Sequence, residues 1–158
     1  MCEPHDEGRR DLQLSLLPTP FSAAQIRDAS RAGKVIRLLV ELEDGSSFER
    51  VNRFRDGDED GATLDQWQAD SADEVSSRRV TWRELQSHAA FPADTTTASS
   101  EVLELPLGRL ECLRYDCAAT QDEPAMTFWF ALAHPGMPVR FEVQGPVGVT
   151  RTTVLSIE

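Results

Sequence analysis

Residues 35–54 read VIRLLVELEDGSSFERVNRF, and this stretch predicts two antiparallel strands joined by a tight turn. Before the turn, apolar residues occupy every second position from Ile36 to Leu42, and the opposite face carries the charged residues Arg37, Glu41 and Glu43. This two-residue period is typical of a half-buried strand. Asp44 and Gly45 then supply the residue pair that tight hairpin turns favour. The chain is therefore expected to contain an antiparallel sheet with one apolar face.

Two capping-box sequences predict two short helices. Ser22 precedes Gln25 by three positions, and Thr81 precedes Glu84 in the same way. In such a box the hydroxyl and the longer side chain each satisfy a backbone N–H at the start of a helix. The predicted helices cover residues 23–31 and 82–90.

The sequence after the first hairpin is expected to complete one sheet. From residue 62 onward, short segments of strand composition alternate with turn residues, and the polar stretch 70–79 is expected to form a loop. The expected fold class is α+β: a curved, half-barrel-like antiparallel meander sheet of about seven to nine strands packed on two short helices. Residues 1–19 are expected to form a flexible N-terminal tail, and residues 20–158 a single domain.

The charge of the chain argues against nucleic acid as a partner. Lys and Arg total 16 against 27 Asp and Glu, which gives a net charge of −11. Such a charge repels a phosphate backbone. The longest uninterrupted apolar run, Phe128–Ala133, is far shorter than the roughly 18 residues of a membrane helix, so no membrane span is expected.

The cysteines and the acidic start of the chain bear on its compartment. Three cysteines, an odd number, argue against a disulfide framework and for reduced thiols. Glu3, Asp6 and Glu7 stand where a secretory signal would carry basic residues. We therefore expect a cytoplasmic protein. In the alternative interpretation, Cys2 is the lipidated first residue of a processed lipoprotein.

The loop at residues 56–61 begins like a calcium-binding loop. Asp56, Asp58 and Asp60 alternate with other residues, as in the first half of that motif. Trp67 occupies the twelfth position, where the motif needs a bidentate glutamate. We therefore expect no bound metal here and interpret the loop as solvated acids between two strands.

The segment 126–133, MTFWFALA, is apolar on both faces. A strand with one face in water would alternate, so this segment is expected to lie inside the sheet with helices over one face. The second face also needs a cover, and the sequence leaves four possibilities: the core itself, an N-terminal segment, a bound ligand or a second subunit. The candidate ligand-binding residues are Trp67, Trp82, Tyr115, Phe128, Trp129 and Phe130.

The second half of the chain, from about residue 80 to 158, resembles uncharacterised small bacterial proteins that are distantly similar to the lipoprotein-carrier (LolA- and LppX-like) superfamily. The resemblance implies an incomplete antiparallel barrel curved around helices, with a hollow that holds lipid or lipoprotein acyl chains. It rests on VTWREL (80–85), FP (91–92), LPLG (105–108), LECLRY (110–115), TFWF (127–130) and PGMPVRF (135–141).

Two functional hypotheses from different classes follow. The first is a non-enzymatic binding module that holds an apolar small molecule or a partner segment in the hollow of the curved sheet. The second is an interaction protein whose apolar sheet face forms a homodimer interface. A small metal-free enzyme ranks third, because no catalytic residue or cofactor motif is evident in the sequence. We therefore expect no cofactor.

Overall fold

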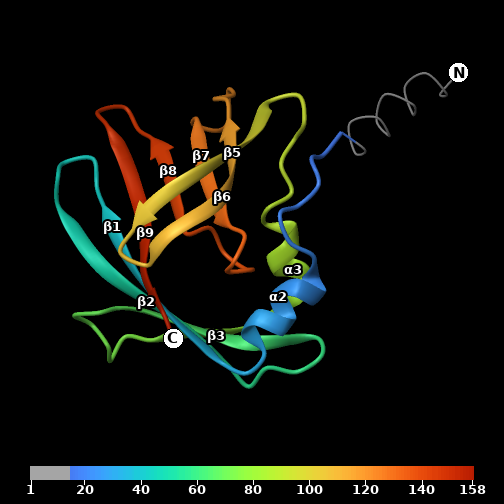
Figure 1. Ribbon diagram of the computed structural model, residues 1–158. Helices are drawn as coiled ribbons and strands as arrows, with labels where there is room; N and C mark the ends of the chain where they lie inside the picture. The colour runs from blue at the N-terminus through green and yellow to red at the C-terminus, as the bar shows by residue number, and fades with distance from the viewer. Residues whose placement is uncertain (1–14) are drawn as a thin grey trace, which may run out of the picture.

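The computed structural model describes residues 15–158 and shows one nine-stranded antiparallel sheet with two short helices, as Figure 1 illustrates. The expected α+β fold with a curved meander sheet is confirmed. The sheet order is β4-β3-β2-β1-β9-β8-β7-β6-β5. The helices are α2 (Ala23–Ser30) and α3 (Trp82–Ser87). The strands are β1 (Lys34–Glu41), β2 (Ser47–Arg55), β3 (Gly61–Gln68), β4 (Ser76–Thr81), β5 (Thr96–Leu105), β6 (Gly108–Cys117), β7 (Met126–Ala131), β8 (Arg140–Gln144) and β9 (Val149–Ile157).

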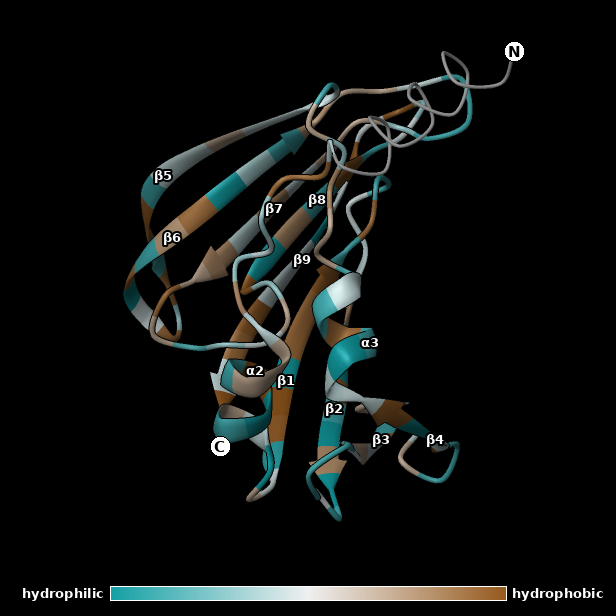
Figure 2. Cartoon of the chain, turned by 90° about the vertical axis from the view of Figure 1, so that its right-hand side faces the viewer, coloured by the Kyte–Doolittle hydropathy of each residue, from teal (hydrophilic) through white to brown (hydrophobic). Residues whose placement is uncertain are grey.

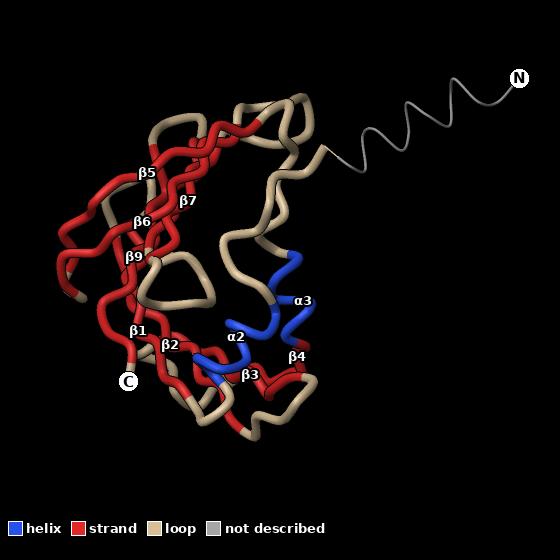
Figure 3. Tube along the Cα trace, turned by 45° about the vertical axis from the view of Figure 1, so that its right-hand side comes forward, coloured by secondary structure: helices blue, strands red, loops and turns tan. Residues whose placement is uncertain are grey.

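Two meanders meet in the middle of the sheet. The first runs outward from β1 to the edge strand β4, and α3 then leads the chain towards the opposite edge, β5. The second meander returns from β5 to β9, which pairs with β1 so that Leu38 lies opposite Val154. The register of this pairing shifts between Arg37 and Leu38. Such a bulge increases local twist, and Figure 3 shows the sheet curving around the helices.

The apolar core lies between the helices and the inner face of the curved sheet. Ile36 and Leu38 of β1 are almost fully buried, and Ile26 of α2 and Trp82 of α3 are buried with them. Figure 2 shows β1 as a largely apolar strand. The two-residue period of residues 35–54 thus places one set of side chains under the helices, as predicted.

Both predicted helix starts are confirmed. The N–H of Gln25 donates to the Ser22 hydroxyl at 3.1 Å, and the N–H of Glu84 donates to the Thr81 hydroxyl at 3.0 Å. The second helix is shorter than expected because the N–H groups of Ala89 and Ala90 donate to carbonyls three residues earlier, which tightens the chain into turns in place of further helical bonds. A helix of six residues therefore suffices to bury Trp82.

The expected loop at residues 70–79 is partly a strand. Ser76–Thr81 forms β4, which pairs with β3 at the edge of the sheet. Its first four residues are exposed, and Val80 is its buried residue. An edge strand with both faces largely in water needs no apolar alternation, which is why the sequence pattern does not reveal it. Arg78 and Arg79 add charge to this open edge.

Residues 15–19, which belong to the expected tail, lie against the segment that follows α3. Leu16 forms an isolated bridge with Pro92, and the N–H of Leu17 donates to the Phe91 carbonyl at 2.8 Å. Residues 1–14 lie outside the described residues, and with them Cys2 and its interpretation as a lipidated residue. Within the described part of the chain, no helix is long and apolar enough to cross a membrane.

The second face of β7 is covered by the chain itself. Trp129 is 5% exposed, and the guanidinium carbon of Arg114 lies 5.2 Å from its ring centroid. The Arg114 guanidinium forms ion pairs with Glu101 of β5 and with Asp116, which lies on β6 like Arg114 itself; both distances are 2.9 Å. Of the four possible covers, the structure therefore shows residues of the same sheet over this tryptophan.

Candidate functional site

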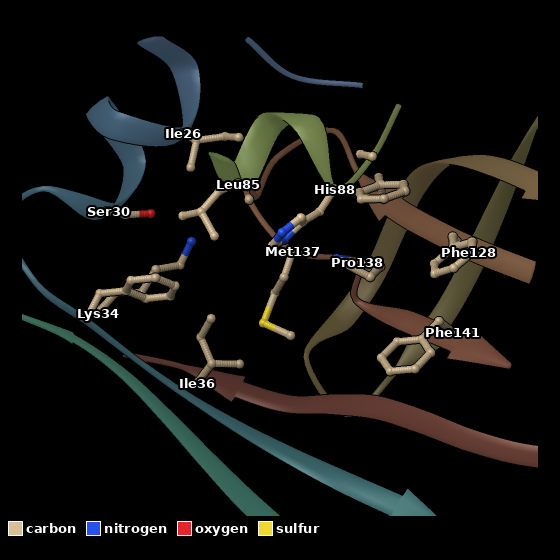
Figure 4. A pocket seen from close by; sticks show the side chains of 14 residues that line it. Ile26, Ser30, Lys34, Ile36, Leu85, His88, Phe128, Met137, Pro138 and Phe141 are labelled. Atoms are coloured by element: carbon tan, nitrogen blue, oxygen red, sulfur yellow. The ribbon is translucent and has the colours of Figure 1, made fainter. Parts of the chain in front are cut away.

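A cavity of about 340 Å³ lies between the helices and the inner face of the sheet. Its floor is formed by Ile36 of β1 and Phe54 of β2, and its roof by Ile26 of α2 and Leu85 of α3. Figure 4 shows Ile26, Leu85 and Ile36 around the same space. We call this cavity the apolar pocket. Its volume is at the small end of the roughly 300–1,000 Å³ that ligand pockets span.

Aromatic side chains form one wall of the apolar pocket. Phe128 and Phe130 of β7 and Phe141 of β8 line it, with the Phe128 and Phe141 rings stacked at a centroid distance of 5.9 Å. Behind them, Phe91 packs against Phe128 at 4.9 Å and against Tyr115 at 5.1 Å. Because these rings support one another, the wall is rigid and its surface is set by large apolar side chains.

The loop between β7 and β8 closes another side of the apolar pocket. Met137 projects into the middle of the view in Figure 4, and Pro138 lies next to it. Met137 is an unbranched side chain that can adapt its shape to a neighbour. Asn52 also reaches this loop, since its amide nitrogen lies 3.7 Å from the Met137 sulfur.

The apolar pocket has one polar end, formed by Ser30 and Lys34. The residues are 3% and 8% exposed, and Figure 4 shows both polar groups facing the cavity. Lys34 Nζ donates to the Pro135 carbonyl at 3.2 Å. Among the described residues, Lys34 has no carboxylate within ion-pair distance. Burial lowers the pKa of the Lys34 ammonium, because desolvation disfavours its charge.

Histidines near this end supply no negative charge to balance Lys34. His88, just after α3, lines the cavity. The pKa of His134 is lowered by burial and, to a smaller extent, by the positive charge of Lys34. A lowered pKa favours neutral imidazole, so His134 adds no second positive charge beside the Lys34 ammonium.

The structure brings three of the six aromatic candidates from the sequence together. Phe128 and Phe130 line the apolar pocket, and Tyr115 packs on Phe130 at a centroid distance of 5.7 Å. These side chains share the inner face because Tyr115 lies opposite Phe128 in the pairing of β6 with β7. Strand parity alone therefore locates this part of the site.

The other three candidates lie away from the apolar pocket. Trp129 follows Phe128 in β7 and so points to the opposite face, under Arg114. Trp67 lies beside Arg53, whose guanidinium carbon is 5.3 Å from its ring centroid. Trp82 is buried at the start of α3.

The acidic loop uses its oxygens to close a turn. Asp58 accepts hydrogen bonds from the N–H groups of Asp60 and Gly61 at 2.8 and 2.9 Å, and Arg79 pairs with it at 2.5 Å. The Asp58 carbonyl accepts the Trp82 indole N–H at 2.8 Å. These bonds to backbone N–H groups lower the pKa of the Asp58 carboxyl. Within residues 15–158, no cluster of three or more metal-ligating side chains forms.

Sequence reasoning missed the residues that complete the apolar pocket. Lys34 precedes Met137 and Phe141 by more than a hundred residues, and only sheet pairing brings it near them. One signal was present for Lys34. Lys34 lies two residues before Ile36 and four before Leu38, so the alternation along the strand places this charged residue on the inward face. It is also the single lysine in the sequence.

Comparisons with known proteins show a likeness in fold. No family model matches the chain, and no curated protein matches it. A chain from the MucA/MucB complex of Pseudomonas aeruginosa superposes with a TM-score of 0.59 at 11% identity, covering 85% of this chain and 54% of that chain. A putative exported protein with a YmcC-like fold from Bacteroides fragilis gives a TM-score of 0.40 at 10% identity, covering 79% and 95% of the two chains.

A putative outer membrane lipoprotein-sorting protein domain from Vibrio parahaemolyticus gives a TM-score of 0.26 at 11% identity, covering 86% of this chain and 90% of that one. These neighbours match the distant lipoprotein-carrier resemblance as a likeness in fold, at 10–11% identity. The expected cytoplasmic location is contradicted by the descriptions of these neighbours, which name an exported protein and an outer membrane lipoprotein-sorting domain; the descriptions apply to those proteins and assign no compartment to this chain. That expectation rested on residues 1–19 and on cysteine parity, neither of which determines a compartment. The chain spans about half, 54%, of the MucA/MucB chain that it matches, and what it shares with that chain is the fold.

Proposed function

We propose that this protein is a binding module that holds an apolar small molecule in the apolar pocket. The observation that carries the proposal is the cavity of about 340 Å³ beneath both helices, walled by Phe128, Phe130 and Phe141. Apolar walls and a few polar groups are the usual features of small-molecule sites. Each Å² of apolar ligand surface that is buried in the pocket would contribute roughly 25 cal/mol of favourable free energy.

The size of the cavity favours a small molecule over a partner segment. A volume of about 340 Å³ lies at the small end of ligand pockets, and the helices cover it from the side opposite the sheet. The homodimer hypothesis required an apolar sheet face to be covered by a second copy. Trp129, the largest side chain of that face of β7, is already buried at 5% exposure by residues of its own chain.

The experiment is a titration with Nile red, an uncharged apolar dye whose fluorescence rises in apolar surroundings. The wild-type protein is expected to bind one dye molecule per chain with saturation. Met137→Trp replaces a linear side chain with a bulky indole ring inside the apolar pocket and is expected to abolish saturable binding. Val147→Trp adds the same ring at a position that is 79% exposed and is expected to leave binding unchanged.

The melting temperature of each variant shows whether it is folded. Equal saturable binding by the wild type and a folded Met137→Trp variant would place the dye elsewhere and refute the proposal. Absence of saturable binding by the wild type would also refute it.

A further inference from the structure

The polar end of the apolar pocket carries a charge that the protein itself does not balance. Lys34 is 8% exposed, and its ammonium has three N–H groups. Among the described residues it makes one hydrogen bond, to the Pro135 carbonyl, and no ion pair. A buried ammonium without a counter-charge costs stability. A perturbed titratable group that lines a cavity is a candidate for ligand binding.

The direction of the Lys34 side chain points to the same conclusion. Figure 4 shows its nitrogen turned into the cavity, between Ser30 and Leu85. Its aliphatic stem belongs to the lining of the pocket. The loop after β7 approaches closely, since a Cβ added at Gly136 would lie 3.3 Å from Nζ. The nitrogen therefore lies at the polar end of the apolar pocket, close to the loop after β7.

We propose that the ligand is a single-chain amphiphile with an anionic carboxylate head, whose head group binds Lys34 and Ser30 and whose tail lies along Met137, Phe128 and Phe141. This inference rests on the proposed function and names its ligand class. An ammonium and a hydroxyl at one end match one carboxylate with two acceptor oxygens. The aromatic wall provides the apolar surface for the tail.

The number of charges and the volume both favour this class. Lys34 supplies one positive charge, which balances one carboxylate but leaves a phosphate dianion half neutralised. A cavity of about 340 Å³ accommodates one short alkyl chain more readily than the several chains of a large lipid. Lys34 is also the single lysine of a chain whose other cationic side chains are arginines. A compact ammonium, unlike a guanidinium, fits the narrow end of a small cavity.

The test compares ligands that share one tail and differ in the head. Decanoate, decanol and decyl phosphate are titrated into the full chain by calorimetry at neutral pH, below their aggregation concentrations. Decanoate is expected to bind the wild type at least about tenfold more tightly than decanol, because a charge-assisted hydrogen bond replaces a neutral one. Decyl phosphate is expected to bind more weakly than decanoate.

Two variants separate the head group from the pocket. Lys34→Met keeps the apolar stem and is expected to weaken decanoate binding about tenfold or more, with decanol binding unchanged within about twofold. Arg37→Met removes a positive charge from the same strand at a half-exposed position on the opposite face, and should change neither affinity. This variant changes the net charge of the protein by the same amount as Lys34→Met, so it controls for an effect of net charge on affinity.

Each remaining outcome counts against one proposal. Decanol binding without a decanoate preference, or a preference that survives in Lys34→Met, would overturn the carboxylate inference and leave the proposed function standing. Tighter binding of decyl phosphate would also overturn it in favour of a phosphate head. Failure of all three compounds to bind the wild type would count against the proposed function itself.

A spectroscopic readout is available because the chain has one lysine. Protein labelled with lysine that carries carbon-13 at Cε alone gives a single side-chain signal, which reports Lys34 without assignment. The signal is expected to shift on addition of decanoate and to stay in place with decanol. A shift of equal size with both compounds would contradict contact between the head group and the ammonium.

Discussion

Lys34 and Pro135 are separated by 101 residues in sequence, and the Lys34 ammonium donates a hydrogen bond to the Pro135 carbonyl at 3.2 Å. The bond joins the first residue of β1 to the loop that closes the apolar pocket. It connects the two meanders of the sheet at the polar end of the cavity. The stability and the charge state of this end are therefore coupled.

The first prediction concerns the stability cost of Lys34. Its pKa in the folded protein lies below the ordinary value of 10.5, so burial disfavours the charged form. At neutral pH, Lys34→Met is expected to raise the free energy of unfolding, because removing a buried unpaired charge outweighs losing one hydrogen bond. Between the folded pKa and 10.5 the unfolded chain binds more protons, so wild-type stability rises with pH relative to the variant.

Urea unfolding of both proteins from neutral pH to pH 10.5 measures this difference. The stability gap should be largest at neutral pH and should narrow as the pH rises. A variant that is less stable than the wild type at neutral pH would show that Lys34 acts as a structural brace for the loop.

The second prediction concerns the cap of α3. Thr81→Ala is expected to lower the free energy of unfolding by about 1 kcal/mol, because the N–H of Glu84 loses the hydroxyl that it contacts at 3.0 Å. Thr81→Ser keeps an acceptor and should cost much less. Urea unfolding gives both values. An unchanged midpoint and slope for Thr81→Ala would mean that the hydroxyl contributes nothing to the start of the helix.

The third prediction concerns a buried carboxylate on the outer face of β3. Asp65 is 1% exposed and accepts hydrogen bonds from Arg53 and Arg55, each at 2.7 Å, and from Ser77 at 2.6 Å. The Arg55 and Ser77 donors hold the pKa of this carboxyl far below its usual 3.8. Asp65→Asn is expected to cost roughly 1.5–3 kcal/mol at neutral pH, because a neutral amide replaces the carboxylate that pairs with Arg53 and Arg55.

A pH series tests the sign of this effect. Because the folded pKa is depressed, the contribution of Asp65 is complete above pH 3.8 and is lost as the pH falls below that value towards the folded pKa. The stability difference between the wild type and Asp65→Asn should therefore be constant above pH 3.8 and shrink below it. Asp73→Asn, at an exposed position, serves as the control. A difference that grows on acidification would contradict the assignment.

The fourth prediction concerns Trp129. Trp129→Ala is expected to lower the free energy of unfolding by about 3–5 kcal/mol, because it empties a buried space under Arg114. Trp67→Ala, which removes a less buried ring beside Arg53, should cost less. The wild-type melting temperature should not depend on protein concentration. A concentration-dependent melting temperature, with dissociation caused by Trp129→Glu, would instead support a homodimer.

Local signals account for the parts of the fold that the sequence predicted. The cap at Thr81 depends on residues three positions apart, and the inward face of β1 depends on a period of two, so both are readable without tertiary contacts. Strand β4 was missed because an exposed edge needs no apolar pattern. Residues 15–19 were assigned to the tail from local composition, which does not show the hydrogen bond of Leu17 to Phe91, a contact between distant segments.

Some residues of the candidate site were likewise predictable from local signals, and others depend on tertiary contacts. Phe128 and Phe130 were predicted because the parity of one strand places them on the inner face. Trp129 was included with them because both faces of that strand are apolar, and the sequence does not show that Arg114 covers one face. Lys34 and Met137 depend on the order in which strands pair, which local periodicity does not specify.

The central claim, that the apolar pocket binds an apolar molecule, is tested most directly by methyl spectroscopy of the methionines. The sequence has three, of which Met137 lines the apolar pocket and Met126 does not. Protein labelled at the methionine methyl carbons is titrated with uncharged decanol. We expect the Met137 signal to shift with saturation and to show magnetisation transfer from the alkyl chain, with Met126 unchanged. An unshifted Met137 signal at saturating decanol, or contacts confined to Met126, would contradict the claim.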